Sequence, residues 1–250
     1  MCLRKELETQ GNWLFSNRSY LPIIILAIGI VLYFRNEILP DNLNTEVTKF
    51  KFYYQYLCLF ISLLGIFVRI YTVGYTPKRT SGRNTKKQVA QSLNKTGIYS
   101  LVRHPLYLGN FLIYFGICLL TGHLWFIITF CLLFWIYYER IMYAEEQFLN
   151  RKFGVDFVNW SEETPAFIPK FRSYVKPSKS FIWKKVIKKE ADGIFALFCI
   201  FFFFDVVGKL IGKSSHINMI IAFSFLFVTI GFIIAKYLKK KTNFLNVAGR

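Results

Sequence analysis

Two groups of polar residues interrupt long apolar runs in the middle of this 250-residue chain. Arg103-His104-Pro105 precedes one apolar run, and Glu139-Arg140 and Glu145-Glu146 close the next. A lone arginine beside a membrane helix is an ordinary interfacial anchor. Paired carboxylates gain nothing from anionic lipid, so they fit that role poorly. These groups are therefore the first candidates for a functional site.

A short connection predicts that the two groups meet in space. Only Thr121-Gly122-His123 separates the apolar runs Leu106 to Leu120 and Leu124 to Tyr138. Helices joined by so few residues run antiparallel, side by side. We therefore expect Arg103-His104 and Glu139 to Glu146 to face each other at one membrane surface.

The apolar runs themselves predict an all-α, polytopic integral membrane protein. The chain is 54 % hydrophobic, against about 45–50 % in ordinary domains. A helix of about 20 apolar residues crosses a bilayer and satisfies its own backbone hydrogen bonds. We expect about six transmembrane helices. Their apolar runs are Tyr20 to Phe34, Phe52 to Val73, Leu106 to Leu120, Leu124 to Tyr138, Ile194 to Leu210 and Ile217 to Leu238.

The charge distribution predicts the orientation. A net charge of +18 would suit nucleic acid, but the excess of Lys and Arg in cytoplasmic loops explains it without that partner. With six helices, 26 of the 32 Lys and Arg residues fall on one side. We therefore expect both termini and both large loops in the cytoplasm, near anionic lipid. No nucleic-acid partner is expected.

Three blocks follow along the chain. Residues 1–74 hold an N-terminal segment and two transmembrane helices, residues 75–169 the basic loop, hairpin and polar tail, and residues 170–250 a basic linker and two last helices. The five cysteines and three histidines show no metal-ligand spacing, so no metal site is expected. Asp205 is an isolated acid within an apolar run, which we expect to cap a helix end or pair with Lys209.

The middle block resembles the isoprenylcysteine carboxyl methyltransferase and phospholipid methyltransferase superfamily of membrane enzymes. That family carries an Arg-His-Pro-x-Tyr-x-Gly run, a helical hairpin, a Glu-Glu pair and a tail ending in a proline-bounded apolar patch. Here the matching segments are Arg103 to Gly109, the hairpin, Glu145-Glu146, and Pro165 to Pro169. The resemblance spans roughly Arg69 to Pro169 and leaves out the last two helices.

The resemblance implies S-adenosyl-L-methionine as cofactor, bound in a cytoplasmic pocket, and assigns candidate residues. Glu145 or Glu146 would contact the cofactor or lie beside the reacting centre. The residues that would bind or enclose the cofactor are His104, Tyr107, Pro105, Gly109, Tyr99, Pro165, Phe167, Ile168 and Pro169. Among them, Pro105 and Gly109 would shape the wall, and Pro165 to Pro169 would help close over the cofactor.

The resemblance also implies a membrane lipid or lipidated methyl acceptor. Arg69, Arg103 and Arg140 are fixed cations that would draw an anionic acceptor oxygen to the site. The stretch from Thr80 to Thr85, followed by Leu93 to Gly97 and Leu106 to Phe111, is similar to the bacterial branch that includes the lipid A 1-phosphate methyltransferases, which implies a bacterial inner membrane. In that reading, Arg79, Arg83, Lys86 and Lys87 would suit a phosphorylated lipid headgroup. A prenylcysteine carboxylate or a phosphatidylethanolamine amine are alternative acceptors. A related sterol reductase using a nicotinamide cofactor, or a membrane scaffold or small transporter, are alternative classes. The oligomeric state is not predicted.

Overall fold

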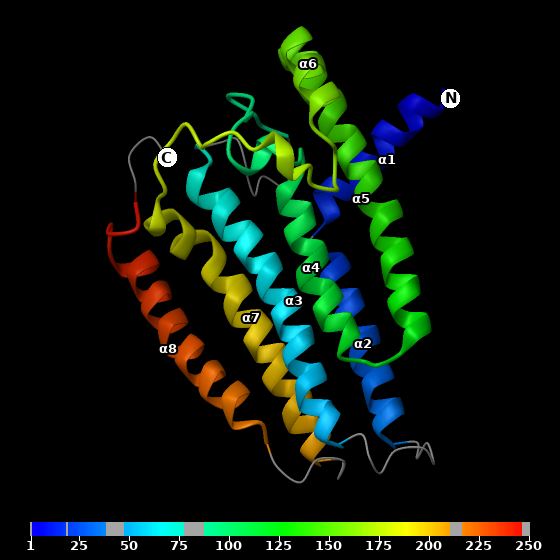
Figure 1. The fold of residues 1–250 in the computed structure, drawn as a ribbon, viewed down its shortest axis with the longest axis vertical. Helices are drawn as coiled ribbons and strands as arrows, with labels where there is room; N and C mark the ends of the chain where they lie inside the picture. The colour runs from blue at the N-terminus through cyan, green and yellow to red at the C-terminus, as the bar shows by residue number, and fades with distance from the viewer. Residues whose placement is uncertain (1, 19, 39–47, 78–87, 211–216, 247–250) are drawn as a thin grey trace.

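The computed structural model describes residues 2–18, 20–38, 48–77, 88–210 and 217–246, and this part of the chain is all-helical (Figure 1). It contains no named strand; one isolated β-bridge joins Gly97 and Val175. The predicted fold class is thus confirmed as all-α. The helices are α1 Leu3–Asn17, α2 Tyr20–Ile38, α3 Thr48–Tyr75, α4 Pro105–Leu119, α5 Leu124–Phe153, α6 Val155–Glu163, α7 Trp183–Leu210 and α8 Met219–Lys241, with short 3-10 turns at Ile98–Ser100 and Phe171–Ser173.

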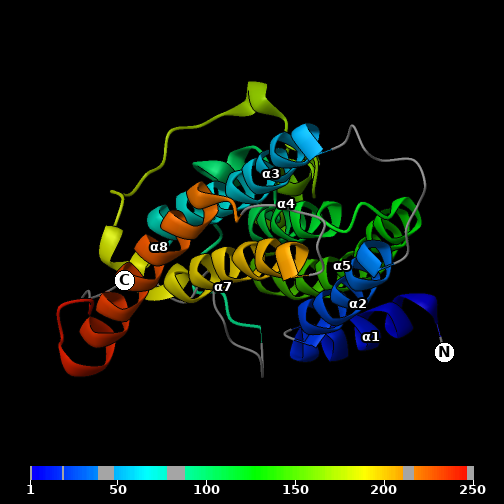
Figure 2. The ribbon, with the colours of Figure 1, turned by 90° about the horizontal axis from the view of Figure 1, so that it is seen from below.

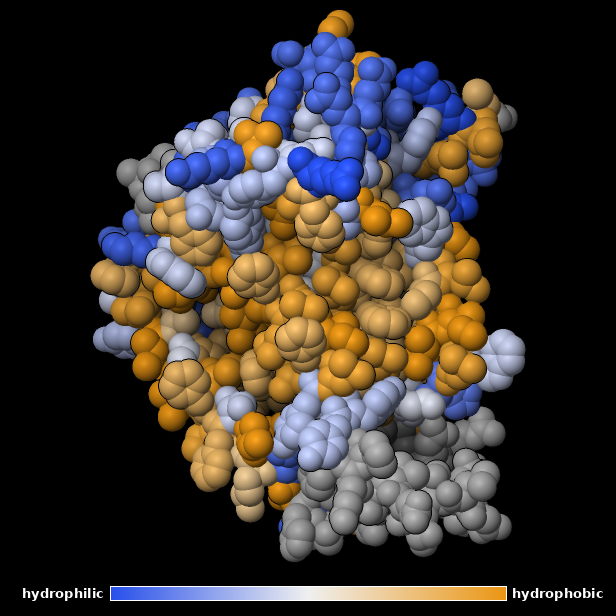
Figure 3. Space-filling model, viewed as in Figure 1, coloured by the Kyte–Doolittle hydropathy of each residue, from blue (hydrophilic) through white to orange (hydrophobic). Residues whose placement is uncertain are grey.

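Four of the described helices are long and apolar enough to cross a membrane. They are α3 from Tyr53, α5, α7 and α8. Helix α4 is apolar but has 15 residues, fewer than the roughly 20 that a full span needs. On the face shown in Figure 3, apolar residues cover the middle of the molecule and polar residues gather at one end. The chain is therefore a membrane protein, while the predicted number of six spans goes beyond these four.

Two helices extend far beyond their apolar runs. Helix α5 continues past Tyr138 to Phe153, and α7 begins at Trp183, well before its apolar run starts at Ile194. Much of the large loop expected between these two apolar runs is therefore helical. Hydropathy indicates which part of a helix lies within the membrane. The helix itself can continue beyond the membrane until a residue that breaks the helical backbone ends it. Helix α5 has no Gly or Pro before Gly154, which takes a positive φ of 52° and ends it.

Helix α1 adds an element that the apolar pattern does not reveal. It packs along the part of α5 that extends beyond the apolar run. Gly11 permits this approach, since a Cβ there would lie 2.7 Å from the Cβ of Ala144. Glu8 pairs with Arg151 at 2.6 Å, and Gln10 accepts a hydrogen bond from Arg140. Figure 2 shows α1 lying beside α2 and α5 at the edge of the bundle.

Helices α3 and α4 make the closest helix contact, through glycines. A Cβ on Gly65 would lie 2.5 Å from the carbonyl oxygen of Gly109. A Cβ on Gly109 would lie 2.6 Å from Cγ of Arg69, and one on Gly116 would collide with Ser62. Small residues allow membrane helices to approach in this way. The contact fixes Arg69 beside the start of α4.

The start of α1 and the end of α8 lie toward the same end of the bundle as α6 (Figure 1). We call this the polar end, because the polar residues in Figure 3 gather there. The start of α4 and the last turns of α5 reach it, while the Thr121–His123 turn lies at the opposite end. The predicted basic loop with Arg79, Arg83, Lys86 and Lys87, which includes the stretch from Thr80 to Thr85, lies outside the described residues.

Candidate active site

A cavity of about 740 Å³ lies between α2, α3, α4, α5 and α7 and reaches the polar end. Its volume is within the roughly 300–1,000 Å³ of small-molecule sites. The lining residues run along α4 from His104 to Ile117, thirteen residues apart, which is about 20 Å of helix. Charged groups lie at the polar end, and isoleucine, leucine and alanine predominate toward the middle of the bundle. The cavity is therefore amphipathic along its length.

Glu146 lies at the centre of a hydrogen-bonded cluster beside the cavity. Its Oε1 accepts from Nε of Arg103 at 2.8 Å and lies 2.9 Å from Nε2 of His104. Nδ1 of His104 is 3.5 Å from Oε2 of Glu145. The hairpin thus brings the Arg-His-Pro segment and the paired acids together, as its short turn predicted.

His104 is buried between these two carboxylates and has 7 % of its surface exposed. Burial alone would lower the pKa of His104. The hydrogen bonds to Glu145 and Glu146, with the charges of both carboxylates, outweigh burial and raise that pKa above its ordinary value. The cluster therefore favours the imidazolium form.

Arg103 fastens the polar tail to the hairpin. Its guanidinium donates to Glu146 and to the carbonyl of Thr164 at 2.7 Å. The backbone N–H groups of Arg103 and His104 donate to the carbonyls of Pro165 and Ala166. Arg103 also lines the cavity. Most of its donors are already used within the protein, so its first role is to hold the tail in place.

The proline-bounded patch, Pro165 to Pro169, packs against α4 and α5. Phe167 packs edge-on against Phe111 and Trp135, with ring centroids 5.9 Å and 5.6 Å away. Ile168 is 78 % exposed. Pro165, Phe167, Ile168 and Pro169 are not among the described residues that line the cavity. The patch fixes the backbone of the Arg103-His104 segment, and a role in covering a cofactor stays a prediction.

Arg69 is paired with an acid from a helix outside the recognised motif. Its guanidinium donates to both carboxylate oxygens of Glu190 on α7, at 2.8 Å and 3.0 Å. A further donor reaches Oδ1 of Asn110 on α4. The side chain of Glu190 is 2 % exposed, so this bidentate pair is buried. Arg69 thus lies at the cavity wall, but its charge is balanced by Glu190.

Two other predicted residues lie away from the cavity. Arg140 donates to Gln10 of α1 and to the carbonyl of Ile136. Gly109 lies in the α3–α4 contact, where it makes room for Arg69 and Gly65. Neither is among the described lining residues. Arg140 therefore joins α5 to α1. Gly109, which was expected to shape the wall of the cofactor pocket, contacts helix α3 instead.

The predicted aromatic residues do line the cavity. The ring of Tyr107 lies nearly parallel to that of His104, with centroids 5.6 Å apart, and also contacts Tyr138. The carbonyl of Tyr99 accepts a hydrogen bond from the indole of Trp160. Burial, and then the charge of Glu145, raise the pKa of Tyr99, so its hydroxyl stays protonated. Pro105 begins α4 and also lines the cavity.

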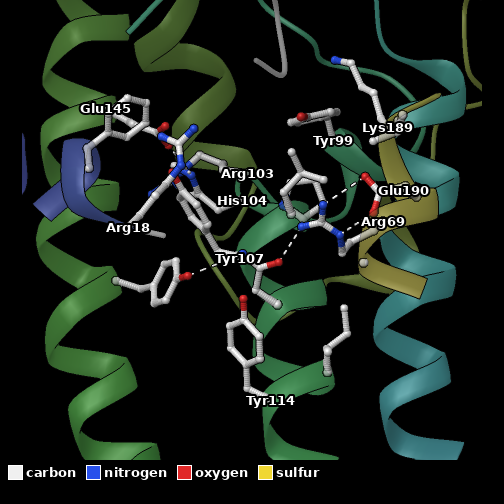
Figure 4. Close-up of a pocket in the computed structure, with 18 of the residues that line it drawn as sticks. Arg18, Arg69, Tyr99, Arg103, His104, Tyr107, Tyr114, Glu145, Lys189 and Glu190 are labelled. Atoms are coloured by element: carbon white, nitrogen blue, oxygen red, sulfur yellow. Dashed lines mark hydrogen bonds and ion pairs between the residues drawn. The ribbon is translucent and has the colours of Figure 1, made fainter. Parts of the chain in front are cut away.

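Several lining residues were not found from the sequence. Arg18, at the end of α1, stacks over the ring of Phe15 at 4.0 Å. Lys189, Glu190 and Asn110 come from α7 and α4. Figure 4 shows Arg69 and Glu190 on one side of the cavity, and Arg103, His104, Glu145 and Arg18 on the other. Among these residues, only Asn110 could have been found from the sequence. It follows the candidate residue Tyr107 by three positions, and residues three apart lie on the same helix face.

Comparison with known families identifies the segment that carries the site. Residues 53–156 match the family model described as phospholipid methyltransferase. The matched segment includes α3, α4 and α5, and therefore Arg69, His104 and both glutamates of the pair. It leaves out α7 and α8.

Curated relatives cover the same part of the chain. A nickel-cobalt-cadmium resistance protein, NccN, of Alcaligenes xylosoxydans xylosoxydans is 33 % identical over 120 residues, 46 % of this chain and 53 % of the relative. Protein-S-isoprenylcysteine O-methyltransferases of Schizosaccharomyces pombe and Saccharomyces cerevisiae are each 30 % identical, over 36 % and 45 % of this chain and 40 % and 47 % of the relatives. The chain thus spans about half the length of the curated relatives it matches. No solved structure matches it significantly.

Proposed function

We propose, from the match of residues 53–156 to the phospholipid methyltransferase family and the similarity to isoprenylcysteine methyltransferases, that the protein transfers a methyl group from S-adenosyl-L-methionine to a membrane lipid or lipidated acceptor. One observation carries the proposal. The Arg103–His104–Glu146 cluster borders the polar end of a cavity whose other end is apolar. A donor with charged groups and an acceptor with an apolar chain would both find suitable surroundings there.

The residues at the polar end fit the cofactor. S-adenosyl-L-methionine carries a carboxylate, an ammonium, a sulfonium and an adenine. The described lining offers a carboxylate in Glu145, cations in Arg18 and Lys189, and aromatic rings in Tyr99 and Tyr107. When bound, the cofactor would supply a methyl group already activated by its positively charged sulfur. We therefore assign cofactor binding to Glu145, His104, Tyr99 and Tyr107.

The two neighbouring glutamates take different roles in this proposal. Glu145 lines the cavity, whereas Glu146 is bonded to Arg103 and His104 and is not among the described lining residues. We assign contact with the cofactor to Glu145 and positioning of His104 to Glu146. The ion pairs of Arg103 and His104 with the carboxylates of Glu145 and Glu146 hold the cluster in place before the cofactor binds, so little rearrangement is needed on binding.

The chemistry favours an anionic oxygen as the acceptor. A carboxylate or phosphate oxygen is already a nucleophile at neutral pH, so the protein must mainly align it with the methyl group and exclude water. Transfer of a methyl group to such an oxygen would release no proton, so the residues of the site would not need to supply a base. A prenylcysteine carboxylate and a lipid phosphate, such as lipid A 1-phosphate, both meet this requirement. An amine acceptor would need a base, and in that case Glu145, which lines the cavity, would take its proton.

The proposed orientation puts this site at the cytoplasmic leaflet of an inner membrane. The polar end carries α6, the start of α1 and the end of α8 (Figure 1), and the last turn of α8 is basic, with Lys239, Lys240 and Lys241. Positively charged segments are retained on the cytoplasmic side. A cytoplasmic site would have direct access to cellular S-adenosyl-L-methionine.

Ligand binding and lipid analysis test the function together. The purified protein in lipid nanodiscs should bind S-adenosylhomocysteine and not NADPH, which would instead indicate a reductase. Lipids of cells that make the protein should contain a species heavier by one methylene group. Glu145→Gln and His104→Ala should abolish that species without loss of membrane insertion, whereas Glu139→Gln, an exposed acid on the same helix, should retain it. Undiminished product from both cavity variants would refute the assignment.

A further inference from the structure

Helix α7 lies outside residues 53–156, yet it forms a wall of the cavity along much of its length. Lys189 and Glu190 line the polar end, and Gly193, Ala196, Leu197 and Ile200 follow along the helix. Spacings of three and four residues place them on one helix face. The seven-residue step from Gly193 to Ile200 corresponds to about 10 Å of wall. That length suits a chain better than a headgroup.

Gly193 lies where the wall changes from charged to apolar. It follows Glu190 by three residues and lines the cavity, and a Cβ built on it would have no heavy atom within 4 Å. The glycines of α3 and α4 differ, because a Cβ on Gly65 or Gly109 would meet another helix. Those glycines permit helix packing. At Gly193 the missing side chain leaves open space in the cavity instead.

The surfaces opposite α7 are apolar. Ile25 and Leu26 of α2, Ile66 of α3, and Ile113 and Ile117 of α4 line this half of the cavity. Beyond Arg69 and Glu190, none of the described lining residues in this half is charged. A charged ligand group would lose its hydration here without gaining a partner. An apolar chain would be stabilised here, because burial removes its surface from water.

We propose, building on the function above, that this half of the cavity is a groove for the apolar chain of the methyl acceptor, and that Gly193 is its specificity-determining residue. The acceptor head lies near Lys189 and the Arg69–Glu190 pair, and its chain passes Gly193 toward Ile200. A larger side chain at Gly193 narrows the groove next to the head. Acceptor choice is then set by α7, outside the segment shared with the family.

Photolabelling with two long-chain anionic probes tests the groove without requiring methyl transfer. The probes are a diazirine-bearing palmitate and a diazirine-bearing farnesyl phosphate, each added to the full chain in nanodiscs. Labelled peptides are then mapped by mass spectrometry. Labelling of the α7 segment 196–200 and of α2 at 25–26 by either probe supports the groove, and the stronger probe identifies a straight or a branched chain.

Gly193→Leu supplies the critical variant, and Gly231→Leu is its matched control. Both glycines are exposed helix residues with open space around a Cβ, but Gly231 does not line the cavity. Gly193→Leu should lower groove labelling by about tenfold or more, Gly193→Ala by less, and Gly231→Leu should leave it unchanged. All variants should bind S-adenosylhomocysteine as the wild type does.

The outcomes separate this inference from the proposed function. Wild-type labelling that stays outside the cavity, or equal groove labelling in Gly193→Leu, overturns the groove even where S-adenosylhomocysteine binds. Groove labelling that depends on Gly193, in a protein that does not bind S-adenosylhomocysteine, supports the groove and overturns the methyltransferase assignment.

Discussion

At the scale of single residues, Glu145 and Glu146 differ in their partners although they are adjacent on α5. Their side chains are similarly exposed, at 24 % and 22 %. Glu146 joins Arg103 to His104, while Glu145 lines the cavity and contacts the other nitrogen of the same imidazole. One helix position therefore separates a structural carboxylate from one that a ligand can reach.

Glu146→Gln should destabilise the protein more than Glu145→Gln. The amide removes the charge that Arg103 and His104 both contact, and hydrogen bonds to charged groups contribute about 1.5–3 kcal/mol. We expect a loss of that order for Glu146→Gln and a smaller one for Glu145→Gln, measured by thermal unfolding in detergent. Equal loss in both variants would contradict the separate roles.

The raised pKa of His104 predicts a stability that depends on pH. Because the folded-state pKa lies above the unfolded value, the contribution of His104 is fully present below about pH 6.5 and is lost as the pH rises through the folded-state pKa. Unfolding free energy should therefore fall over that range. His104→Gln should remove this component, while His123→Gln, at the turn of the hairpin, should retain it. A wild-type profile that rises with pH over the same range would exclude this role.

At the scale of elements, the contact between α3 and α4 decides whether the site is assembled. Gly65 and Gly109 let the helices approach until the backbone of one meets the other. Arg69 then reaches Asn110 on α4 and Glu190 on α7 at the same time. The position of the cavity wall thus depends on residues that contact no ligand.

Gly65→Ala should separate these helices. The new Cβ would lie 2.5 Å from the carbonyl oxygen of Gly109, and such overpacking costs about 1–3 kcal/mol. The melting temperature in detergent should fall, and S-adenosylhomocysteine affinity should fall with it. Gly231→Ala is the control, since its Cβ meets nothing within 4 Å and alanine favours a helix interior by about 0.5–1 kcal/mol. A Gly65→Ala protein as stable as Gly231→Ala would show that the contact tolerates a side chain.

At the scale of the whole molecule, the bundle places the start of α1, the end of α8 and the candidate site toward its polar end (Figure 1). The net charge of +18 and the three lysines in the last turn of α8 agree with the proposed placement of this end at a cytoplasmic leaflet, whose surface is anionic. A lipid acceptor held in that leaflet would present its head at the level of His104 and its chain toward the apolar half of the cavity.

Reporter fusions test that orientation. Green fluorescent protein fused to either terminus should fluoresce in bacterial cells, and alkaline phosphatase at the same places should be inactive. Alkaline phosphatase inserted at Gly122, in the hairpin turn at the other end of the bundle, should be active. The reverse pattern would place the cavity mouth outside the cytoplasm and separate it from S-adenosyl-L-methionine.

The sequence by itself determined the helical class and the meeting of Arg103-His104 with Glu145-Glu146. Both depend on local properties: apolar runs of membrane length, and a turn too short for any arrangement but an antiparallel hairpin. The motif order also revealed the similarity to the methyltransferase family that residues 53–156 match, because the motif residues are close in sequence. The apolar runs underestimate the lengths of α5 and α7. Both helices continue through polar residues, which are unfavourable inside the membrane but compatible with a helix outside it.

Only the tertiary structure decided which residues share the cavity. Glu190 is 121 residues from Arg69 in sequence, and no local pattern relates them. Arg140 and Gly109 carry the expected residue types, but their helix faces turn toward α1 and α3. Asp205 accepts a hydrogen bond from the backbone of Asn218, which caps α8. Such pairings depend on how whole helices pack, and packing is a property of many distant residues at once.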